Sequence, residues 1–534
     1  METFDYVIAG GGTAACILAY RLAVAGHSVC VLEAGPPDNN PYMKIPAGFV
    51  KTLFDPKVTW QLTSQPNPNS NHRRIPYTQG KTLGGSSTVN GMVYNRGQGA
   101  DFDEWAQRGN IGWGYADILP YFRRTENWIG GEDTVYRGTE GQLQTSISRW
   151  PNVAVDAFVA AAQTLGHPYN PDYNGARQEG VGFYQSAIAK GRRNSTATAF
   201  LRPAQRQHGV DVRTHALVTD ITLQGGTATG ITYLRDGRKQ SIHARREVII
   251  AAGATNSPKL LQLSGIGPSD LLQTHGIAVR HALPGVGENF RDHYSPRLVV
   301  RAKQHVDTLN SHVTGLPLWS EFAKWLTRRP SVLSLAPALV HVFGRSGPEL
   351  QRPDYSLVFT PGSYKQGFIG RLDDFPGLTC GAWQMRPESA GYVRVSSANP
   401  QDAPLLDPNY LAEGADCAVI IKALKAARAI FQAPSVAALI EAELFPGQDV
   451  QSDDEWLAFA RQYGNSSYHL IGTCRMGVAE DPLSVVDARL RVHGLNALRV
   501  VDASVMPTMP SANTCAATMM IAEKAADMIL ADAA

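Results

Sequence analysis

A histidine in a setting suited to chemistry stands in the stretch NSSYHLIGTCRMG, residues 465–477. His469 lies among serines, a tyrosine, glycines and a cysteine, where an imidazole can act as a general base, bind a metal or pack in a core. The stretch alone does not separate these three roles. The spacings HxxxH, HExxH and CxxC do not occur in the chain, so we expect no metal site.

The N-terminal segment carries the pattern of a dinucleotide site. The run FDYVIA suits a buried strand, GGGTAA suits a tight turn, ACILAYRLAVAG has apolar residues at helical spacing, and SVCVLEAG suits a second strand. Gly10 permits the turn, Gly12 lets the backbone approach a pyrophosphate, and Ala15 takes the place of the third glycine. The helix N-terminus presents free N–H groups to the diphosphate. Glu33, which follows Gly10 by 23 residues, is placed to accept hydrogen bonds from a ribose.

A second dinucleotide fingerprint is not found elsewhere in the sequence. The segments GGTATG at 225–230 and GIGPSD at 265–270 both miss the pattern. One tightly held dinucleotide without a second site favours a flavin over a diffusing nicotinamide cofactor. On these residues alone a nicotinamide-dependent dehydrogenase also stays open.

Composition restricts the class of protein. A chain of 534 residues exceeds what one hydrophobic core usually organises, so we expect two domains. The 43% hydrophobic and 18% charged residues are typical of a soluble globular protein. The net charge of +2 gives no electrostatic basis for a nucleic-acid partner, and short basic pairs such as Arg192–Arg193 are interpreted as solvated surface.

Location is inferred from what the sequence does not contain. Six cysteines in so long a chain do not make a disulfide framework. No apolar run approaches the length of about 18 residues that a spanning helix needs, so we expect no membrane span. No basic segment precedes an apolar stretch at the start, so we expect no secretory signal and a reduced, cytoplasmic location.

Further segments must bring these groups together. Residues 36–78 are rich in Pro and Asn and predict a long irregular excursion, whereas the glycines, serines and asparagine of 79–97 suit either a wrap around a planar or phosphorylated ligand or a surface loop. The strand EVIIAAG is expected to return the chain to the nucleotide-binding sheet. Residues 296–465, with many Pro, Trp and Tyr, predict a separate substrate-binding lobe.

The C-terminal segment predicts a strand followed by a helix. LRVVDASVMP is typical of a buried strand and ends in an acid, Asp502. SANTCAATMMIAEKAADMIL is typical of a helix, and Asn513 and Thr514 suit its N-terminus.

Several ordered motifs together carry a family resemblance. They are GKTLGGSSTVNGMVYNRGQGADFD (80–103), GATNSPKLLQLSGIG (253–267), LPGVGENFRDH (283–293), YHLIGTCRMG and VVDASVMPTMPSANTCAATMMIAEKAADMI. In this order they resemble the two signatures, the connecting motif and the C-terminal catalytic region of the glucose–methanol–choline (GMC) family of FAD-dependent oxidoreductases, over nearly the whole chain.

The resemblance implies an α/β fold, α+β overall. We expect a Rossmann-like FAD-binding domain and a second, substrate-binding domain built on an antiparallel sheet with helices. The FAD-binding domain is expected to be discontinuous, with residues 1–155, 207–295 and 480–534. The substrate-binding domain would then hold residues 156–206 and 296–479.

Matched position by position, the resemblance makes His469 and Asn513 the active-site pair. It places around FAD a larger set of residues: Gly10, Gly12, Thr13, Ala14, Glu33, Ala34, Thr82, Gly85, Asn90, Gly91, Met92, Val93, Val218, Asp502, Ala503 and Thr514. Some members attach FAD covalently through a histidine where this chain has Val89. Valine cannot form that bond, so we expect the FAD to be non-covalent. Many relatives read NTNAPT where this chain reads NTCAAT, which leaves the shape of that loop and the substrate preference open.

The implied activity is oxidation of an alcohol. His469 would take the hydroxyl proton as hydride leaves the carbon for flavin N5, and Asn513 would donate to the substrate oxygen. We expect a neutral primary alcohol and its aldehyde product. The electron acceptor, O2 or another diffusible acceptor, and the state, monomer or homo-oligomer, stay open. The alternative is an enzyme like the FAD-containing hydroxynitrile lyases, whose flavin does no redox work.

Overall fold

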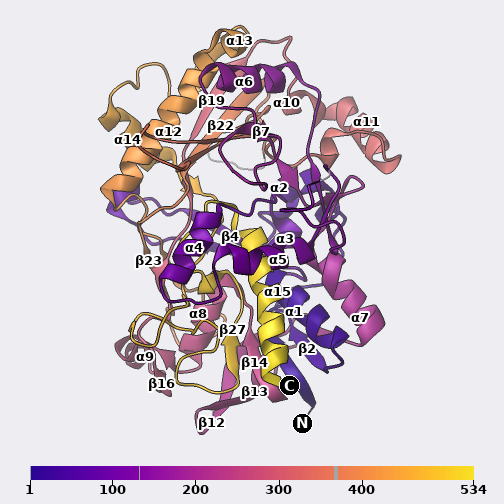
Figure 1. Cartoon of the computed structure of the whole chain (residues 1–534), viewed down its shortest axis with the longest axis vertical. Helices are drawn as coiled ribbons and strands as arrows, with labels where there is room; N and C mark the ends of the chain where they lie inside the picture. Colours follow the sequence, from indigo (N-terminus) through magenta and orange to yellow (C-terminus); the bar gives the residue numbers. More distant parts are fainter. Residues whose placement is uncertain (1, 132, 366–370, 534) are drawn as a thin grey trace.

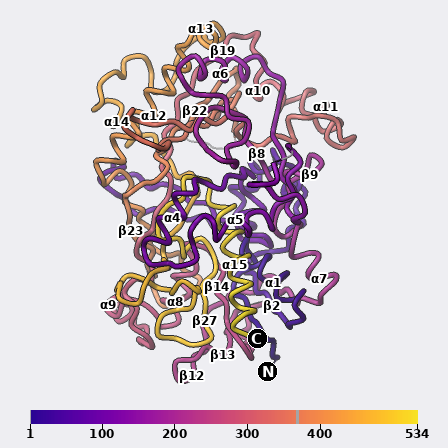
Figure 2. The backbone as a smooth tube through the Cα atoms, in the orientation of Figure 1, coloured from indigo at the N-terminus to yellow at the C-terminus, as the bar shows by residue number. Residues whose placement is uncertain are grey.

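The computed structural model describes residues 2–131, 133–365 and 371–533 (Figure 1). In Figure 1 one half of the molecule, at the bottom, holds a mainly parallel sheet, and the other half, at the top, holds an antiparallel sheet. Both chain ends lie at the bottom, and Figure 2 shows that the orange part of the chain forms much of the top half. The predicted combination of a Rossmann-like domain with an antiparallel sheet is therefore confirmed.

The sheet of the first half has seven strands in the order β11–β2–β1–β14–β13–β12, with β27 also paired to β14. Its strands are β1 (Thr3–Ala9), β2 (Val29–Leu32), β11 (Asp211–Arg213), β12 (Leu217–Gln224), β13 (Thr227–Arg235), β14 (Arg238–Ile250) and β27 (Leu498–Val500). The first part of β14 pairs with β13 in antiparallel fashion, and its last part lies parallel to both β1 and β27. The strand EVIIAAG therefore does return the chain to the nucleotide-binding sheet.

Two long helices cover this sheet beside each other. Helix α1 (Thr13–Val24) follows the glycine turn, and α15 (Thr514–Ala533) begins directly after Asn513, as the sequence predicted. The two helices pack together in the main hydrophobic core, and small side chains such as Ala19 and Ala522 let them approach closely. This packing holds Asn513 at the edge of the sheet.

The sheet of the second half has six strands, all antiparallel, in the order β25–β19–β22–β21–β20–β7. They are β7 (Gly180–Phe183), β19 (Arg297–Ala302), β20 (Val340–Gly344), β21 (Tyr355–Thr360), β22 (Gly377–Gln384) and β25 (Ile440–Phe445). Alternate residues such as Leu298 and Phe359 face the helices α6 (Val153–Thr164) and α12 (Gly414–Gln432) in a second core. The residues between them face the first half.

Further elements connect and flank the two sheets. The helices are α2 (Phe49–Thr52), α3 (Ser86–Val89), α4 (Gly99–Gln107), α5 (Tyr115–Thr125), α7 (Arg202–His208), α8 (Gly253–Leu263), α9 (Ser269–Thr274), α10 (Leu309–His312), α11 (Gly315–Leu326), α13 (Pro434–Ala437) and α14 (Asp453–Tyr463). The short strands are β3 (Thr59–Thr63), β4 (Pro76–Gly80), β5 (Glu126–Trp128), β6 (Leu143–Ile147), β8 (Gln185–Ser186), β9 (Ile188–Ala189), β10 (Arg192–Arg193), β15 (Ile266–Gly267), β16 (His281–Ala282), β17 (Glu288–Phe290), β18 (Tyr294–Ser295), β23 (Gly391–Arg394), β24 (Leu405–Asp407) and β26 (Asn465–Ser466). Among the described residues, no helix is both long enough and apolar enough to cross a membrane.

One segment does not pack with the domain to which the sequence analysis assigned it. Those limits place 156–206 with the substrate domain, but the π-helical turn Ala197–Leu201 lies against α1 in the core of the first half. Phe200 and Leu201 are fully buried there, because their apolar side chains fill space beside α1. This turn therefore packs with the first half, and the domain limits stay a prediction.

Glu523 ties α15 to its neighbours. Its fully buried carboxylate accepts hydrogen bonds from Arg21 of α1 at 2.8 and 2.9 Å and from Arg124 at 2.8 Å. We expect Glu523→Gln to lower the free energy of unfolding by about 2 kcal/mol, because it leaves two partly buried guanidinium groups without their shared charge. Asp527→Asn is the control, since Asp527 contacts Arg124 from a half-exposed position and should cost about 0.5 kcal/mol at most. Urea denaturation of both variants tests this, and equal losses would contradict it.

Candidate active site

One cavity extends from the carboxyl ends of the parallel strands to the inner face of the antiparallel sheet. Its wall begins at Ala9 and Leu32, the last residues of β1 and β2, which is where ligands bind in open α/β sheets. All but one of the residues predicted to contact FAD or substrate line it: Gly10, Gly12, Thr13, Ala14, Glu33, Ala34, Gly85, Asn90, Gly91, Met92, Val93, Val218, His469, Asp502, Ala503, Asn513 and Thr514. Residues that are distant in sequence therefore share a single site.

Thr82 is the exception, because it lies behind the cavity wall. Its hydroxyl donates to the carbonyl oxygen of Pro36 at 2.9 Å, and its own carbonyl accepts from Gly85 N at 2.8 Å. The side chain is fully buried. Thr82 therefore shapes the turn at Gly84 and Gly85, and its predicted contact with FAD stays a prediction.

The nucleotide end is a backbone cradle that side chains would fill. Gly10 has φ +102°, and a Cβ there would lie 2.5 Å from the oxygen of Ala251. Gly85 has φ +53°, and its Cβ would lie 2.8 Å from the Cα of Gly12. At Gly12 itself no protein atom lies closer than 3.7 Å to the ideal Cβ position. Packing within the chain does not require a glycine at 12, whereas close approach of a diphosphate does.

Glu33 is buried at the end of β2, with 6% of its surface exposed. One carboxylate oxygen accepts from Gly11 N and the other from Gly35 N, each at 2.8 Å. Burial raises the pKa of Glu33 to about 7, although these two hydrogen bonds oppose the shift. Each oxygen keeps a lone pair, so the carboxylate can still accept from ribose hydroxyls.

The side chain of Asp502 is already occupied by protein groups. One oxygen accepts from Gly253 N at 2.8 Å and from the hydroxyl of Ser257 at 2.5 Å, and the other accepts from Ser504 N at 2.8 Å. These bonds join the end of β27 to the start of α8. Asp502 lies on the cavity wall but mainly fixes the backbone around Ala503.

Arg193 corrects the interpretation of Arg192–Arg193 as solvated surface. Arg193 is 94% buried, because its segment inserts behind α3, and 6% of its surface is exposed. Its Nη1 donates to Asn90 Oδ1 at 2.9 Å and to the oxygen of Ser87 at 3.2 Å, while Nε and Nη2 have no partner in the described chain. Burial lowers the pKa of Arg193 to about 9. Arg193 does not itself line the cavity, so it acts on the site through Asn90, whose side chain it holds.

The segment expected beside the isoalloxazine is held in a strained shape. Met92 has φ +61°, which a non-glycine residue rarely adopts. Asn90 Oδ1 accepts from Met92 N at 2.9 Å as well as from Arg193. The oxygen of Asn90 is therefore used by the protein, and its NH2 group lies beside the thiol of Cys515.

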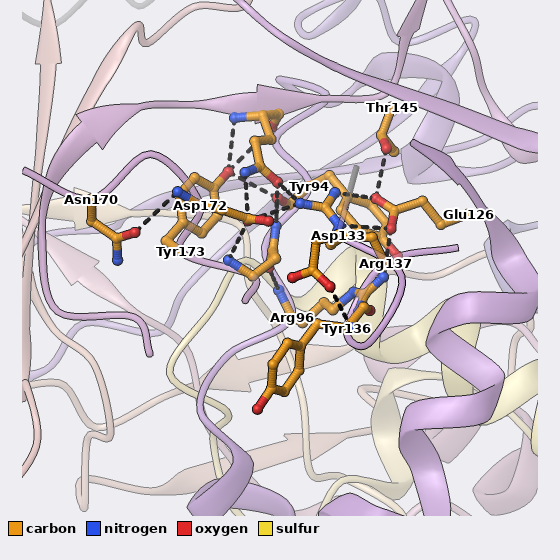
Figure 3. Close-up of polar contacts among 12 residues, drawn as sticks. Tyr94, Arg96, Glu126, Asp133, Tyr136, Arg137, Thr145, Asn170, Asp172 and Tyr173 are labelled. Carbon is orange, nitrogen blue, oxygen red and sulfur yellow. Dashed lines mark hydrogen bonds and ion pairs between the residues drawn. The ribbon is translucent and has the colours of Figure 1, made fainter. Parts of the chain in front are cut away.

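A buried ion cluster anchors the chain just beyond this segment (Figure 3). Glu126 accepts from Arg96 at 2.5 Å and from Arg137 Nε at 2.9 Å, and Arg137 also donates to Asp172 at 2.8 Å. Tyr173 donates its hydroxyl to the oxygen of Tyr94 at 2.9 Å. The cluster clamps residues 94–96, so it restricts where residues 90–93 can lie.

His469 lies in a chain of hydrogen bonds that determines which of its nitrogens is the base. His293 Nε2 is 2.8 Å from the carbonyl oxygen of Met385, which can only accept, so this nitrogen donates. His293 Nδ1 is then the acceptor for His469 Nδ1–H, at 2.9 Å. His469 Nε2 consequently carries the lone pair, and it lies 2.9 Å from Asn513 Nδ2, a donor. Because the carbonyl of Met385 can only accept, neutral His469 carries its proton on Nδ1 and its basic lone pair on Nε2.

Burial keeps this pair of imidazoles neutral. It lowers the pKa of His469 well below the usual range, with the neighbouring His293 as a second cause, and it lowers the pKa of His293 to about 4. Asp292 accepts from the backbone N of His469 at 2.7 Å. Tyr468, just before the base, has φ +62°. The sequence contains His293 and Asp292 in the motif LPGVGENFRDH, but their contact with His469 was not predicted from it.

Among the described residues, no group of three or more His, Cys, Asp or Glu side chains could hold a metal. The glycine cradle, Glu33 and the N-termini of α1 and α15 instead fit FAD.

Comparison with known proteins agrees with this site. The family models described as GMC oxidoreductase match residues 4–295 and 387–522. An oxygen-dependent choline dehydrogenase of Photobacterium profundum is 37% identical over 99% of this chain and 93% of its own length. An alcohol dehydrogenase [acceptor] of Pseudomonas putida is 39% identical, over 99% of this chain and 96% of its own.

Solved structures share the whole fold. Pyridoxine 4-oxidase from Mesorbium loti has a TM-score of 0.87 at 29% identity, with 98% of each chain covered. An FAD-dependent oxidoreductase from Chaetomium thermophilum has a TM-score of 0.89 at 26% identity, with 99% of each chain covered. This chain belongs to the GMC oxidoreductase family, and it is an FAD-dependent oxidoreductase that acts on alcohols.

Proposed function

We propose that the chain oxidises a primary alcohol to the aldehyde, with His469 as the general base and Asn513 orienting the substrate oxygen. The observation that supports this most is the hydrogen-bond chain that leaves a lone pair on His469 Nε2 beside Asn513. Bound FAD supplies the hydride acceptor at N5. The residues that would hold it are those of the glycine cradle, Glu33 and the segment 90–93, which Arg193 supports through Asn90.

The role of His469 follows from what an alcohol needs. An alcohol is a poor hydride donor until its hydroxyl proton is leaving, so the base must be unprotonated and close to that hydroxyl. A positioned base contributes about 10²–10⁴-fold to such a reaction. His469 is neutral because it is buried, and it lines the cavity wall. The lone pair of its Nε2 accepts from Asn513, and the substrate hydroxyl would take the place of that contact.

Asn513 supports the same step from the end of a helix. Its Nδ2 has a second hydrogen beyond the one directed at His469, and that hydrogen can bond the substrate oxygen as negative charge develops. Asn513 Oδ1 is buried and has no hydrogen-bond partner in the described structure. The N-terminus of α15 lies directly behind, and its positive dipole end favours negative charge at this point.

The substrate of this site carries no positive charge. Glu33 and Asp502 are the acidic residues that line the cavity in the described chain, and both lie at its nucleotide end. Trp383 lines the cavity beside His469, with ring centroids 6.0 Å apart, but Trp319 is 73% exposed on α11 and forms no cage with it. The choline dehydrogenases among the relatives are named for a cationic substrate, whereas this cavity has no carboxylate near the base to pair with one.

The electron acceptor is O2 or another diffusible acceptor, and production of hydrogen peroxide compared with dye reduction by the same alcohol distinguishes them. The relatives are named as dehydrogenases and oxidases, so redox chemistry is favoured over the lyase reaction. Anaerobic bleaching of the flavin by an alcohol tests that choice.

We expect FAD to leave the protein on acid precipitation. Position 89 is a valine that lines the cavity and has no atom able to bond the flavin covalently. Absorbance at 450 nm should appear in the supernatant after trichloroacetic acid treatment. Yellow colour retained in the pellet would show a covalent bond at another residue.

His469→Ala should slow anaerobic flavin reduction by about 10²–10⁴-fold while FAD stays bound. In the unaltered enzyme the active form is neutral His469, so the rate should stay constant as pH falls and decline only well below pH 6.5, where the lowered pKa is reached. Stopped-flow spectroscopy from pH 5 to 9 measures both effects. His275→Ala, at the end of α9 and away from the cavity, is the control. Bleaching at a normal rate in the His469 variant would exclude it as the base.

His293 is a positioning residue, and its test compares two replacements. His293→Phe removes the acceptor for His469 Nδ1–H, which should cost about 1 kcal/mol and slow flavin reduction about 3–10-fold. His293→Gln keeps an acceptor for His469 and a donor for Met385, so it should recover most of the rate. Both variants should bind FAD normally by fluorescence titration. If Gln is as slow as Phe, the hydrogen-bond chain does not control the base.

A further inference from the structure

Arg297 is a cation on the substrate side of the cavity. It begins β19 and lies opposite Gly381 of β22, which in turn lies opposite Val358 of β21. All three line the cavity, because they occupy the face of the sheet that turns away from the second core. Gly381 has no side chain between Arg297 and Val358, and an ideal Cβ there would lie 3.2 Å from Ser295 Oγ and 3.6 Å from Arg297 Cγ.

The guanidinium of Arg297 has no hydrogen bond and no ion pair to any described residue. Residues 366–370, which lie outside the described chain, contain no acidic side chain in the sequence. Lys259, the other cation on the cavity wall, donates instead to the carbonyl oxygens of Pro400 and Asp402 at 2.8 and 2.6 Å. Arg297 is therefore the cavity cation whose hydrogen-bond donors are available.

Two phenols lie near Arg297. Burial raises the pKa of Tyr364 and of Tyr468, and the charge of Arg297 opposes the rise for both. Tyr364, Tyr468 and Trp383 line the cavity, so flat aromatic walls lie between the cation and the base.

Trp383 links the position of Arg297 to the base along the cavity wall. Trp383 follows Gly381 by two residues on the same face of β22, or about 7 Å along the strand. The Trp383 ring centroid lies 6.0 Å from that of His469. A substrate whose hydroxyl meets His469 can therefore reach Arg297 with its other end.

We propose that the substrate is an alcohol whose far end carries a carboxylate, held by Arg297, with a flat, aromatic body between the two groups. The proposal rests on the proposed oxidation of a primary alcohol at His469. Arg pairs with carboxylate through two parallel hydrogen bonds, which gives both strength and orientation. The neutral alcohol expected from the sequence is thereby replaced by an anionic one, because the sequence did not place Arg297 in the cavity.

The test compares three primary alcohols of one shape by anaerobic flavin reduction in the holoenzyme: 4-(hydroxymethyl)benzoate, benzyl alcohol and 4-(hydroxymethyl)phenyl-trimethylammonium. The unaltered enzyme should have the highest kcat/KM for the anion and the lowest for the cation. Arg297→Gln should lower the ratio of anion to neutral kcat/KM about 10–100-fold, mainly through KM, because it removes a charged hydrogen-bond pair. Arg297→Lys should keep part of the preference.

Arg301→Gln is the matched control. Arg301 lies four residues on along the same face of β19, outside the cavity, with its guanidinium 4.5 Å from the ring of Phe375. This variant should keep the anion-to-neutral ratio of the unaltered enzyme. Terephthalate, which has no oxidisable carbon, should inhibit competitively and lose at least tenfold in affinity in Arg297→Gln.

The possible failures are distinguishable. If Arg297→Gln lowers kcat/KM equally for the anion and the neutral alcohol, Arg297 supports the shape of the cavity or the flavin and does not bind a carboxylate. That result would overturn the proposal. If benzyl alcohol reduces the flavin as well as the benzoate does in the unaltered enzyme, oxidation at His469 stands and the anionic substrate falls. If none of these compounds nor any simple alcohol bleaches the flavin, the proposed function itself fails.

Discussion

The reactive centre depends on one carbonyl group. Met385 O accepts from His293, and because a carbonyl cannot donate, every later bond in the chain through His469 to Asn513 has a determined direction. Met385 follows β22 of the antiparallel sheet, and Asn513 precedes α15 on the parallel one. The base is therefore correctly protonated only when both halves of the molecule are docked. The buried anchor at Glu523 fixes the helix that follows Asn513, and the ion cluster at Glu126 fixes residues 94–96 next to the cavity segment 90–93.

Buried charges in this protein fall into two groups: those that pair with an opposite charge of the chain and those that do not. Glu126 and Glu523 each form ion pairs with two arginines, and these pairs hold together the elements that support the site. Arg193 has two nitrogens without partners, and Arg297 has none of its donors engaged by described residues. An unmatched charge is unfavourable in the empty protein but contributes to affinity when a ligand of opposite sign arrives. On this basis, Arg297 belongs with the substrate end of the cavity, whereas Arg193 lies behind the cavity wall and contacts it through Asn90.

Local patterns made the frame predictable. The strand, turn and helix around Gly10, the acid at Glu33 and the helix after Asn513 are determined by neighbours within a few turns, and the structure confirms them. The prediction that His469 and Asn513 meet came from the family resemblance, not from spacing. Contacts between residues that are far apart in sequence were not predicted. His293 lies 176 residues from His469, and the residues around either one do not indicate a hydrogen bond between them. Arg193 was taken for surface because burial depends on what packs over a residue, which its own neighbours do not show.

The antiparallel sheet explains how one reaction can be combined with different substrates. Along β19, β21 and β22 the residues of one parity, such as Leu298, Phe359 and Cys380, form the second core under α12. Those of the other parity, Arg297, Thr360 and Gly381, form the cavity wall. A change on the cavity face leaves the core contacts intact, so its cost in stability is small. The base, in contrast, lies on an irregular segment held by Asp292 and by a strained Tyr468, where almost any change disturbs several bonds at once. Specificity can therefore vary on the strand face while the chemistry at His469 stays constrained.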